Sequence, residues 1–204
     1  MQSIKLETEK LTPTKVVCVG RNYTAHIAEL NNETPEQMVL FNKPNSAITS
    51  TLLSEHNNDV LHYETELCFI IKNKQIAGVG LGLDLTKRTV QSKLKNKGLP
   101  WERAKAFDSS VILTDFVEHS DAAQHFTFEL KINDKVTQQG DTHFMLHKPE
   151  QILKEISEFM SLEDGDIIMT GTPSGVGEVK RGNTFSVSLY FNEKCLLAQQ
   201  WVAQ

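Results

Sequence analysis

The chain has 204 residues, of which 39% are hydrophobic and 23% are charged, and its formal net charge is −5 at pH 7. This composition excludes an extensively disordered chain and predicts one folded domain over residues 1–204. The net negative charge, and the lack of a basic run interleaved with aromatic residues, argue against a surface that binds nucleic acid. No apolar run approaches the roughly 20 residues that a membrane-spanning helix needs.

The N-terminal segment and the cysteines indicate a cellular compartment. The first 15 residues lack the apolar core of a signal peptide. Three scattered cysteines, Cys18, Cys68 and Cys195, form no CxxC pattern. We therefore expect buried free thiols in a reducing, cytoplasmic compartment, and no disulfide framework.

The first half of the chain predicts short strands and one short helix. Residues 16–19 form a β-branched run that ends at Gly20, and Thr24 is placed to cap a helical turn over 25–30. Thr34 and Pro35 match a second helix start, and residues 41–48 are predicted as loop. Residues 61–86 predict two strands joined by a turn at 72–75, and glycines at 78, 80 and 82 indicate a bend or close backbone approach.

The second half predicts two helices among further strands. Thr86 is placed to cap a helix over 87–98, and residues 148–160 repeat apolar side chains at helical spacing. Strands are predicted within 109–117, 126–142 and the tail after residue 165. Because strands outnumber helices and do not alternate with them regularly, the pattern favours an α+β fold with a mixed or antiparallel sheet over a doubly wound one.

Two glutamates in the apolar run "LHYETELCFII" need an explanation. Side chains alternate between the faces of a strand, so Glu64 and Glu66 share one face, roughly 7 Å apart. Asp84 ends the next predicted strand and could lie opposite them across a hairpin. A hard divalent ion, Mg²⁺ or Mn²⁺, would relieve the repulsion among these carboxylates. The alternative is a solvated edge or an ion pair with lysine or arginine.

Three further patterns could contribute to catalysis or binding, and each also has an interpretation without a functional role. His26 and Glu29 share a helix face, as a general base and its orienting carboxylate would, although an exposed pair without a role fits equally. Lys105 could hold a negatively charged oxygen, or be a surface lysine. The segment "TGTPSGVG" could present amides and hydroxyls to an anion, or be a tight turn.

Seven segments in this order resemble the fumarylacetoacetate hydrolase family, and the resemblance covers residues from about 16 to 190. They are "GRNYTAHIAEL", "FNKPNSAI", "HYETELCFII", "GLDLTKRTVQ", "GLPWERAKAF", "QQGDTHFM" and "LEDGDIIMTGTPSGVG". The stretch "KGLPWERAKAFDSS" is most similar to the short, single-domain branch of acylpyruvases and oxaloacetate decarboxylases.

The resemblance implies a fold, a cofactor and a site. The fold is a mixed β-sheet roll with a few short helices, usually in a homodimer, and the cofactor is Mg²⁺ or Mn²⁺. The implied residues fall into three groups: metal ligands Glu64, Glu66 and Asp84; catalytic residues His26, Glu29 and Lys105; and substrate-site residues Arg21, Gln91 and Thr172. His26 belongs to a lid that usually orders when ligand binds. Thr89 and the segment "DTHFMLHKPE" depart from the family pattern.

The expected substrate is a small 2-oxo acid, and the expected reaction passes through a metal-stabilised enolate. Hydrolysis of acylpyruvates to pyruvate and a carboxylic acid, decarboxylation of oxaloacetate, and isomerisation or hydration of a 2-oxo acid all fit this intermediate, and the residues leave the choice open. A non-catalytic metal-stabilised binding protein is an alternative from another class, but it gives His26, Glu29 and Lys105 no role. A metal-dependent nuclease is disfavoured by the acidic balance.

Overall fold

The computed structural model describes residues 1–30, 35–121 and 124–204. Within these residues an eight-stranded mixed sheet has the order β4-β3-β15-β9-β10-β11-β5, with β12 beside β10. β15 runs parallel to β3, and β11 runs parallel to β5. The strands of this sheet are β3 (Lys15–Gly20), β4 (Val39–Pro44), β5 (Ile48–Thr49), β9 (Thr65–Lys72), β10 (Gln75–Asp84), β11 (Val111–Leu113), β12 (Val117–Glu118) and β15 (Ile167–Met169).

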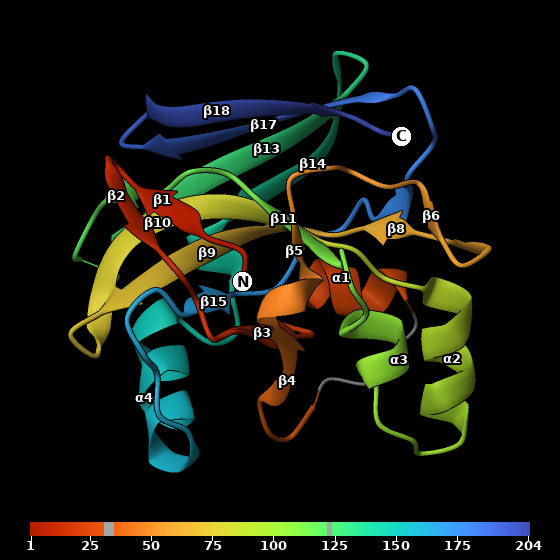
Figure 1. Cartoon of the computed structure of the whole chain (residues 1–204), viewed down its shortest axis with the longest axis horizontal. Helices are drawn as coiled ribbons and strands as arrows, with labels where there is room; N and C mark the ends of the chain where they lie inside the picture. The colour runs from red at the N-terminus through yellow and green to blue at the C-terminus, as the bar shows by residue number, and fades with distance from the viewer. Residues whose placement is uncertain (31–34, 122–123) are drawn as a thin grey trace.

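A four-stranded antiparallel sheet lies above the larger sheet in the view of Figure 1. Its strands, in the order β14-β13-β17-β18, are β13 (Phe126–Ile132), β14 (Lys135–Asp141), β17 (Thr184–Phe191) and β18 (Lys194–Val202). The remaining strands form pairs: β1 (Ile4–Leu6) with β2 (Glu9–Leu11), β6 (Glu55–His56) with β7 (Asp59–Val60), and β8 (His62–Tyr63) with β16 (Gly177–Glu178).

The helices are short and lie below the larger sheet in the view of Figure 1, on the side away from the smaller sheet. They are α1 (Thr24–Glu29), α2 (Arg88–Asn96), α3 (Glu102–Lys105) and α4 (Pro149–Phe159), with the 3₁₀ turns η1 (Asn45–Ala47) and η2 (Thr142–Phe144). Among the described residues, no helix is long and apolar enough to cross a membrane. The predicted α+β class, a mixed sheet with few short helices, is confirmed.

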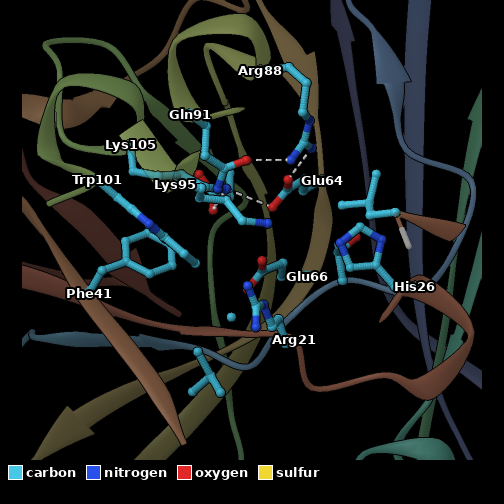
Figure 2. A pocket seen from close by; sticks show the side chains of 15 residues that line it. Arg21, His26, Phe41, Glu64, Glu66, Arg88, Gln91, Lys95, Trp101 and Lys105 are labelled. Atoms are coloured by element: carbon cyan, nitrogen blue, oxygen red, sulfur yellow. Dashed lines mark hydrogen bonds and ion pairs between the residues drawn. The ribbon is translucent and has the colours of Figure 1, made fainter. Parts of the chain in front are cut away.

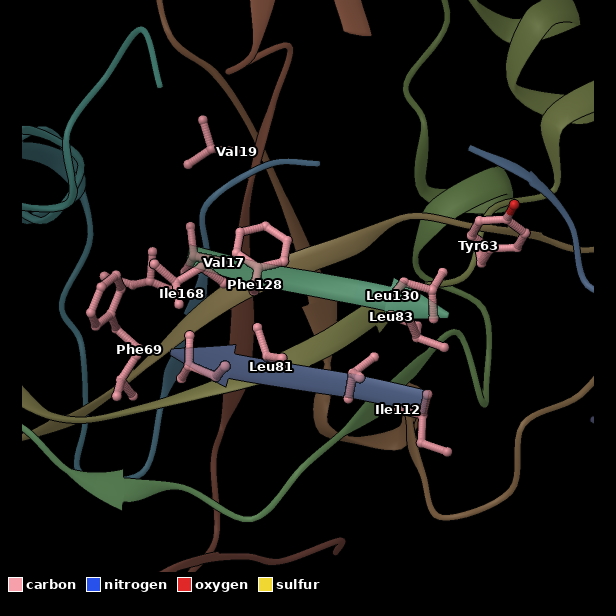
Figure 3. Packing of buried hydrophobic residues seen from close by; sticks show 14 of the residues in the cluster. Val17, Val19, Tyr63, Phe69, Leu81, Leu83, Ile112, Phe128, Leu130 and Ile168 are labelled. Atoms are coloured by element: carbon pink, nitrogen blue, oxygen red, sulfur yellow. The ribbon is translucent and has the colours of Figure 1, made fainter. Parts of the chain in front are cut away.

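The main core fills the space between the two sheets. Phe69 and Leu81 of the larger sheet share one hydrophobic cluster with Phe128 and Leu130 of the smaller one, and all four are at most 2% exposed (Figure 3). Cys68 and its neighbours on the other face of β9 join a second cluster. Both faces of β9 are therefore buried, so the polar side chains at its start lie against the protein interior and away from bulk water.

The β9–β10 hairpin is formed by a tight turn. Asn73 and Lys74 both have positive φ, at 53° and 60°, as the two central residues of a type I′ turn require. Gly78 confirms the predicted close approach, because an added Cβ would lie 2.5 Å from Leu6 Cδ1 and 2.7 Å from the Val117 carbonyl oxygen. The hairpin register therefore fixes which residues at its open end face each other.

Several local predictions were wrong. Residues 41–44, predicted as loop, belong to β4, because that strand pairs along the whole of β3. Thr24 is the first residue of α1 and not its cap, which is Tyr23. Cys195 is exposed, since β18 is an edge strand, whereas Cys18 and Cys68 are buried free thiols as expected. Thr34, the predicted start of a second helical turn, lies outside the described residues.

Candidate active site

Three carboxylates meet at the open end of the β9–β10 hairpin. Glu64 precedes β9, Glu66 is its second residue, and Asp84 ends β10, where its N–H donates to the Glu64 carbonyl oxygen at 2.9 Å. One ligand oxygen from each side chain lies within 4.8 Å of the others, and all three residues are buried. The alternation of the strand and the hairpin register thus bring together the residues that the sequence placed at a metal site.

The pKa of Glu66 shows how strongly these buried carboxylates repel one another. Burial raises the pKa of the Glu66 carboxyl well above its usual range, and the neighbouring charges of Asp84 and Glu64 raise it further. The positive charge of Lys105 and a hydrogen bond from the Gly171 N–H, at 2.7 Å, only partly offset these effects. A divalent ion would relieve the same repulsion, so the oxygen-only donor set fits Mg²⁺ or Mn²⁺.

Lys105 of α3 inserts its ammonium group among these acids (Figure 2). Its Nζ lies 2.6 Å from Asp84 Oδ2, 2.8 Å from Glu64 Oε2 and 2.6 Å from Thr86 Oγ1. Burial lowers the pKa of Lys105, but the charges of Asp84 and Glu64 outweigh burial and leave the pKa raised. Thr86, predicted as a helix cap, therefore serves this site, and Lys87 occupies the N-cap position of α2.

Arg88 is a site residue that the sequence reasoning missed. Its guanidinium forms an ion pair with Glu64 Oε1 and donates to Gln91 Oε1 at 2.7 Å. Burial alone would raise the pKa of Glu64, but Lys105 and Arg88 hold it well below its usual range. Both oxygens of Glu64 thus face cationic groups, and each oxygen keeps a second lone pair with which it could hold a metal ion. Thr89, which departs from the family pattern, is exposed.

Lys43 is a second residue that was missed. It is completely buried, a rare state for lysine unless it is paired. Its Nζ lies 2.8 Å from Asp84 Oδ1, donates to the Ser110 carbonyl oxygen at 3.0 Å, and also donates to the Lys105 carbonyl oxygen. Lys43 therefore fixes both Asp84 and the backbone that carries Lys105. The only signal in the sequence was its place inside the motif "FNKPNSAI".

His26 and Glu29 form the predicted pair on α1. His26 Nδ1 lies 3.1 Å from Glu29 Oε2, and Glu29 Oε1 accepts a hydrogen bond from the Gly175 N–H at 2.9 Å. His26 is 6% exposed and lines the same pocket as the three acids. The resemblance allowed His26 to lie far from the acids without ligand, but α1 is closed over the pocket here. With Nδ1 engaged by Glu29, Nε2 is the nitrogen available for proton exchange.

The glycine-rich segment binds the protein's own carboxylates. The N–H groups of Gly171 and Gly175 donate to Glu66 and Glu29, as described above. The Thr172 hydroxyl accepts a hydrogen bond from Gln138 Nε2 at 2.9 Å, and the exposed Ser174 lies outside the pocket lining. The predicted anion loop therefore orients a candidate metal ligand and the candidate base pair.

One pocket collects these side chains (Figure 2). The space between its side chains amounts to about 420 Å³, part of which is open to solvent. Eight of the predicted site residues line it: Arg21, His26, Glu64, Glu66, Asp84, Gln91, Lys105 and Thr172. Residues that were not predicted complete the lining: Val19, Gly20, Leu30, Phe41, Arg88, Lys95 and Trp101. Glu29 acts on this pocket through His26.

His125, Asp141 and His143 form a second cluster of metal-ligand side chains within the described chain. The two imidazole rings stack, with centroids 3.9 Å apart and planes 13° from parallel. Because each ring donates its lone pair in its own plane, these stacked rings cannot both direct a nitrogen at one ion. This arrangement is not a preformed metal site.

Comparisons with known proteins agree with the geometry. The family profile described as fumarylacetoacetate (FAA) hydrolase C-terminal matches residues 15–199. The chain is 40% identical over 191 residues to an oxaloacetate tautomerase of Escherichia coli, covering 85% of this chain and 87% of that protein. It is 35% identical over 191 residues to the mitochondrial oxaloacetate tautomerase of Homo sapiens, covering 86% of each.

A solved structure adds a bound metal to the comparison. The fumarylpyruvate hydrolase of Pseudomonas aeruginosa, in complex with Mn²⁺ and pyruvate, superposes with a TM-score of 0.87 at 26% identity. The alignment covers 99% of this chain and 95% of that one.

Proposed function

The chain belongs to the fumarylacetoacetate hydrolase family, and from this membership we propose that it is a divalent-metal-dependent enzyme of small 2-oxo acids, with keto–enol tautomerisation of oxaloacetate as its main reaction. One observation carries the proposal: three carboxylates, the Lys105 ammonium and the His26–Glu29 pair converge on a single pocket. Relatives named oxaloacetate tautomerase support the choice of reaction.

Glu64, Glu66 and Asp84 are the proposed ligands of Mg²⁺ or Mn²⁺. When bound, such an ion withdraws electron density from a carbonyl oxygen and thereby acidifies the neighbouring C–H group. The oxygen-only ligand set suits either ion. The Mn²⁺ in the structure of the Pseudomonas aeruginosa hydrolase supports the use of a divalent ion.

The chain's own residues then move one proton. His26 Nε2 takes a proton from C3 of the keto acid and returns it to the oxygen on C2, which gives the enol and leaves the imidazole neutral. Glu29 orients the imidazole and stabilises its charged form. Lys105 Nζ, held in place by Asp84 and Glu64, stabilises negative charge as it grows on the C2 oxygen. No carbon–carbon bond breaks and no water is consumed.

Hydrolysis of acylpyruvates is the second candidate, supported by the similarity to the fumarylpyruvate hydrolase. In this reaction His26 takes a proton from water, hydroxide attacks C4, the C3–C4 bond breaks, and pyruvate leaves as its enolate beside Lys105. Decarboxylation of oxaloacetate gives the same pyruvate enolate, which Lys105 would stabilise in the same way, and it does not consume water. The residues alone leave the choice among these reactions open, and the 35–40% identity to tautomerases supports placing tautomerisation first.

The alternatives from other classes explain less. A non-catalytic metal-binding protein does not require the His26–Glu29 pair and Lys105 to share the pocket with the acids. The homodimer and the cytoplasmic location remain predictions. Relatives include mitochondrial proteins.

The isosteric variant Glu66→Gln tests the proposal. Calorimetry with Mg²⁺ and oxalate, an enolpyruvate mimic, measures binding, and ultraviolet absorbance of the enol measures oxaloacetate tautomerisation. We expect the wild type to bind oxalate only with metal, and the variant to lose both metal affinity and turnover. Glu178→Gln, an exposed site on β16, is the control. Unchanged metal dependence and turnover in Glu66→Gln would refute the site.

A further inference from the structure

Gln138 of β14 is a buried polar side chain to which the proposed function gives no role. It is 1% exposed, and its amide lies between the first residue of β9 and the glycine-rich segment. β14 packs closely against that segment, because a Cβ added to Gly175 would lie 2.2 Å from the Thr137 carbonyl oxygen and 3.2 Å from Gln138 Cγ. A buried amide is costly unless its oxygen and nitrogen are both hydrogen-bonded, so its partners are informative.

The hydrogen bonds of Gln138 fix the orientation of its amide. Its Oε1 accepts from the Thr65 N–H at 3.0 Å, and its Nε2 donates to the Pro173 carbonyl oxygen at 2.9 Å. A backbone N–H can only donate and a backbone carbonyl oxygen can only accept, so exchanging the amide oxygen and nitrogen would break both bonds. The second hydrogen of Nε2 is therefore the one directed at Thr172 Oγ1, also at 2.9 Å.

This orientation limits what the Thr172 hydroxyl can do. An amide nitrogen cannot accept a hydrogen bond, so the hydroxyl oxygen accepts from Gln138 and its own hydrogen points elsewhere. Within the described parts of the chain, the acceptor it contacts is the Pro173 carbonyl oxygen at 3.4 Å, beyond the roughly 2.5–3.0 Å of an ordinary O–H···O bond. Because Thr172 is 3% exposed and lines the pocket, its hydrogen is available to a ligand bound there.

We propose that Gln138 is a positioning residue that makes the Thr172 hydroxyl a hydrogen-bond donor to an anionic oxygen of the bound ligand. This inference rests on the proposed function, in which the ligand is a 2-oxo acid or its enolate. Gln138 occupies a lone pair of the hydroxyl, and it also bonds the Pro173 carbonyl oxygen, which would otherwise compete for the hydroxyl hydrogen. The donor is thus oriented before the ligand binds, as preorganised stabilisation of negative charge requires.

A double-mutant cycle between Gln138 and Thr172 tests this role, with calorimetry of oxalate binding at saturating Mg²⁺ as the measurement. Gln138→Glu keeps the shape of the side chain and an acceptor for the Thr65 N–H, but its carboxylate accepts the Thr172 hydrogen and so reverses the bond. Thr172→Val removes the hydroxyl with little change in shape. We expect each single variant to bind oxalate at least ~10-fold more weakly, because a hydrogen bond to a charged group is lost.

The double variant separates a positioning role from a merely structural one. Because both single variants lose the same hydrogen bond, the double variant should bind oxalate about as weakly as Gln138→Glu alone. Independent effects would instead multiply to roughly 100-fold and would refute the positioning role, as would unchanged oxalate affinity in Gln138→Glu. Gln138→Met, which adds no charge, should cause a smaller loss that disappears in the Thr172→Val background, and thermal unfolding checks that each variant is folded.

Gln139→Glu is the matched control, because Gln139 is exposed on the same strand and the substitution adds the same charge. It should bind oxalate as the wild type does. A lower Mg²⁺ affinity of Gln138→Met without oxalate would show that Gln138 acts through the carboxylates on either side of Thr65, and would also refute the role. In each of these cases the proposed function stands, whereas both proposals fail if the wild type does not bind oxalate with Mg²⁺ present.

Discussion

Lys105 and Asp84 form an ion pair of 2.6 Å whose side chains are only 3% and 1% exposed. This pair belongs to a buried series of ion pairs in which positive and negative side chains alternate. The order of the series is Lys43–Asp84–Lys105–Glu64–Arg88. Removing one member of such a series leaves a buried charge without compensation, which is far more costly than losing an exposed pair. The candidate active site is therefore also a structural element that joins β4, β10, α2 and α3.

Glu29→Gln tests how the base is oriented. The amide keeps an oxygen for the Gly175 N–H, but it offers an N–H to His26 Nδ1. His26 would then carry its proton on Nε2 and could not accept another there. We expect oxaloacetate tautomerisation to fall by about 10²–10⁴-fold with metal affinity unchanged, measured by enol absorbance and calorimetry. A variant with full activity would remove the pair from the mechanism.

Lys43→Met tests the buried positive charge behind the site. The variant fills similar space but leaves the Asp84 carboxylate without the positive charge of Lys43 and the Ser110 carbonyl oxygen without its donor. We expect the free energy of unfolding to fall by about 3–5 kcal/mol in urea denaturation. Lys5→Met is the matched control, because its side chain is 61% exposed, and should change less than about 1 kcal/mol. Equal effects of the two variants would contradict this role.

Gly171→Ala tests the amide that holds Glu66. Gly171 has φ +96°, and an added Cβ would lie 2.8 Å from Asn22 Cβ. Gly182 has φ +83° with nothing within 4 Å, so Gly182→Ala carries the backbone strain alone, about 1–2 kcal/mol. We expect Gly171→Ala to be less stable than this control and to bind Mg²⁺ about 10-fold more weakly, because its N–H is displaced from Glu66. Identical metal affinities would refute the link.

Asp166 predicts an acid-sensitive contribution to stability. Its buried carboxylate accepts hydrogen bonds from the Glu163 N–H, from Lys15 Nζ and from the N–H and hydroxyl of Thr14. Burial alone would raise the pKa of Asp166, but these bonds hold it below the usual 3.8. A folded-state pKa below the unfolded one stabilises the protein above about pH 4, and this stabilisation is lost as pH falls through the folded-state pKa.

The variant Asp166→Asn isolates that contribution. In urea denaturation from pH 7 to pH 3, the variant should be less stable than the wild type by about 1–3 kcal/mol near pH 7. The difference should shrink below pH 4, as the wild-type carboxyl becomes protonated. A difference that stays constant over this range would show that Asp166 does not act through its charge.

Much of the site follows from the sequence, because local geometry fixes it. Two-residue alternation places Glu64 and Glu66 on one face, and a tight turn at 73–74 brings Asp84 opposite them. Helical spacing pairs His26 with Glu29 in the same way. The α+β class likewise follows from the order of the elements, and the resemblance to the family added Arg21 and Gln91.

Only the tertiary structure decided what depends on contacts between distant elements. Nothing local distinguishes Lys43 from a surface lysine, because its burial arises when β4 pairs with β3 and lies against α3. The glycine-rich segment binds Glu66 and Glu29 only because β15 lies beside β9 and α1 closes over it. Sequence patterns report which face a residue occupies. The packing of elements then determines which charged side chains come into contact. Because a buried charge without a partner is costly, only arrangements that pair these charges are stable.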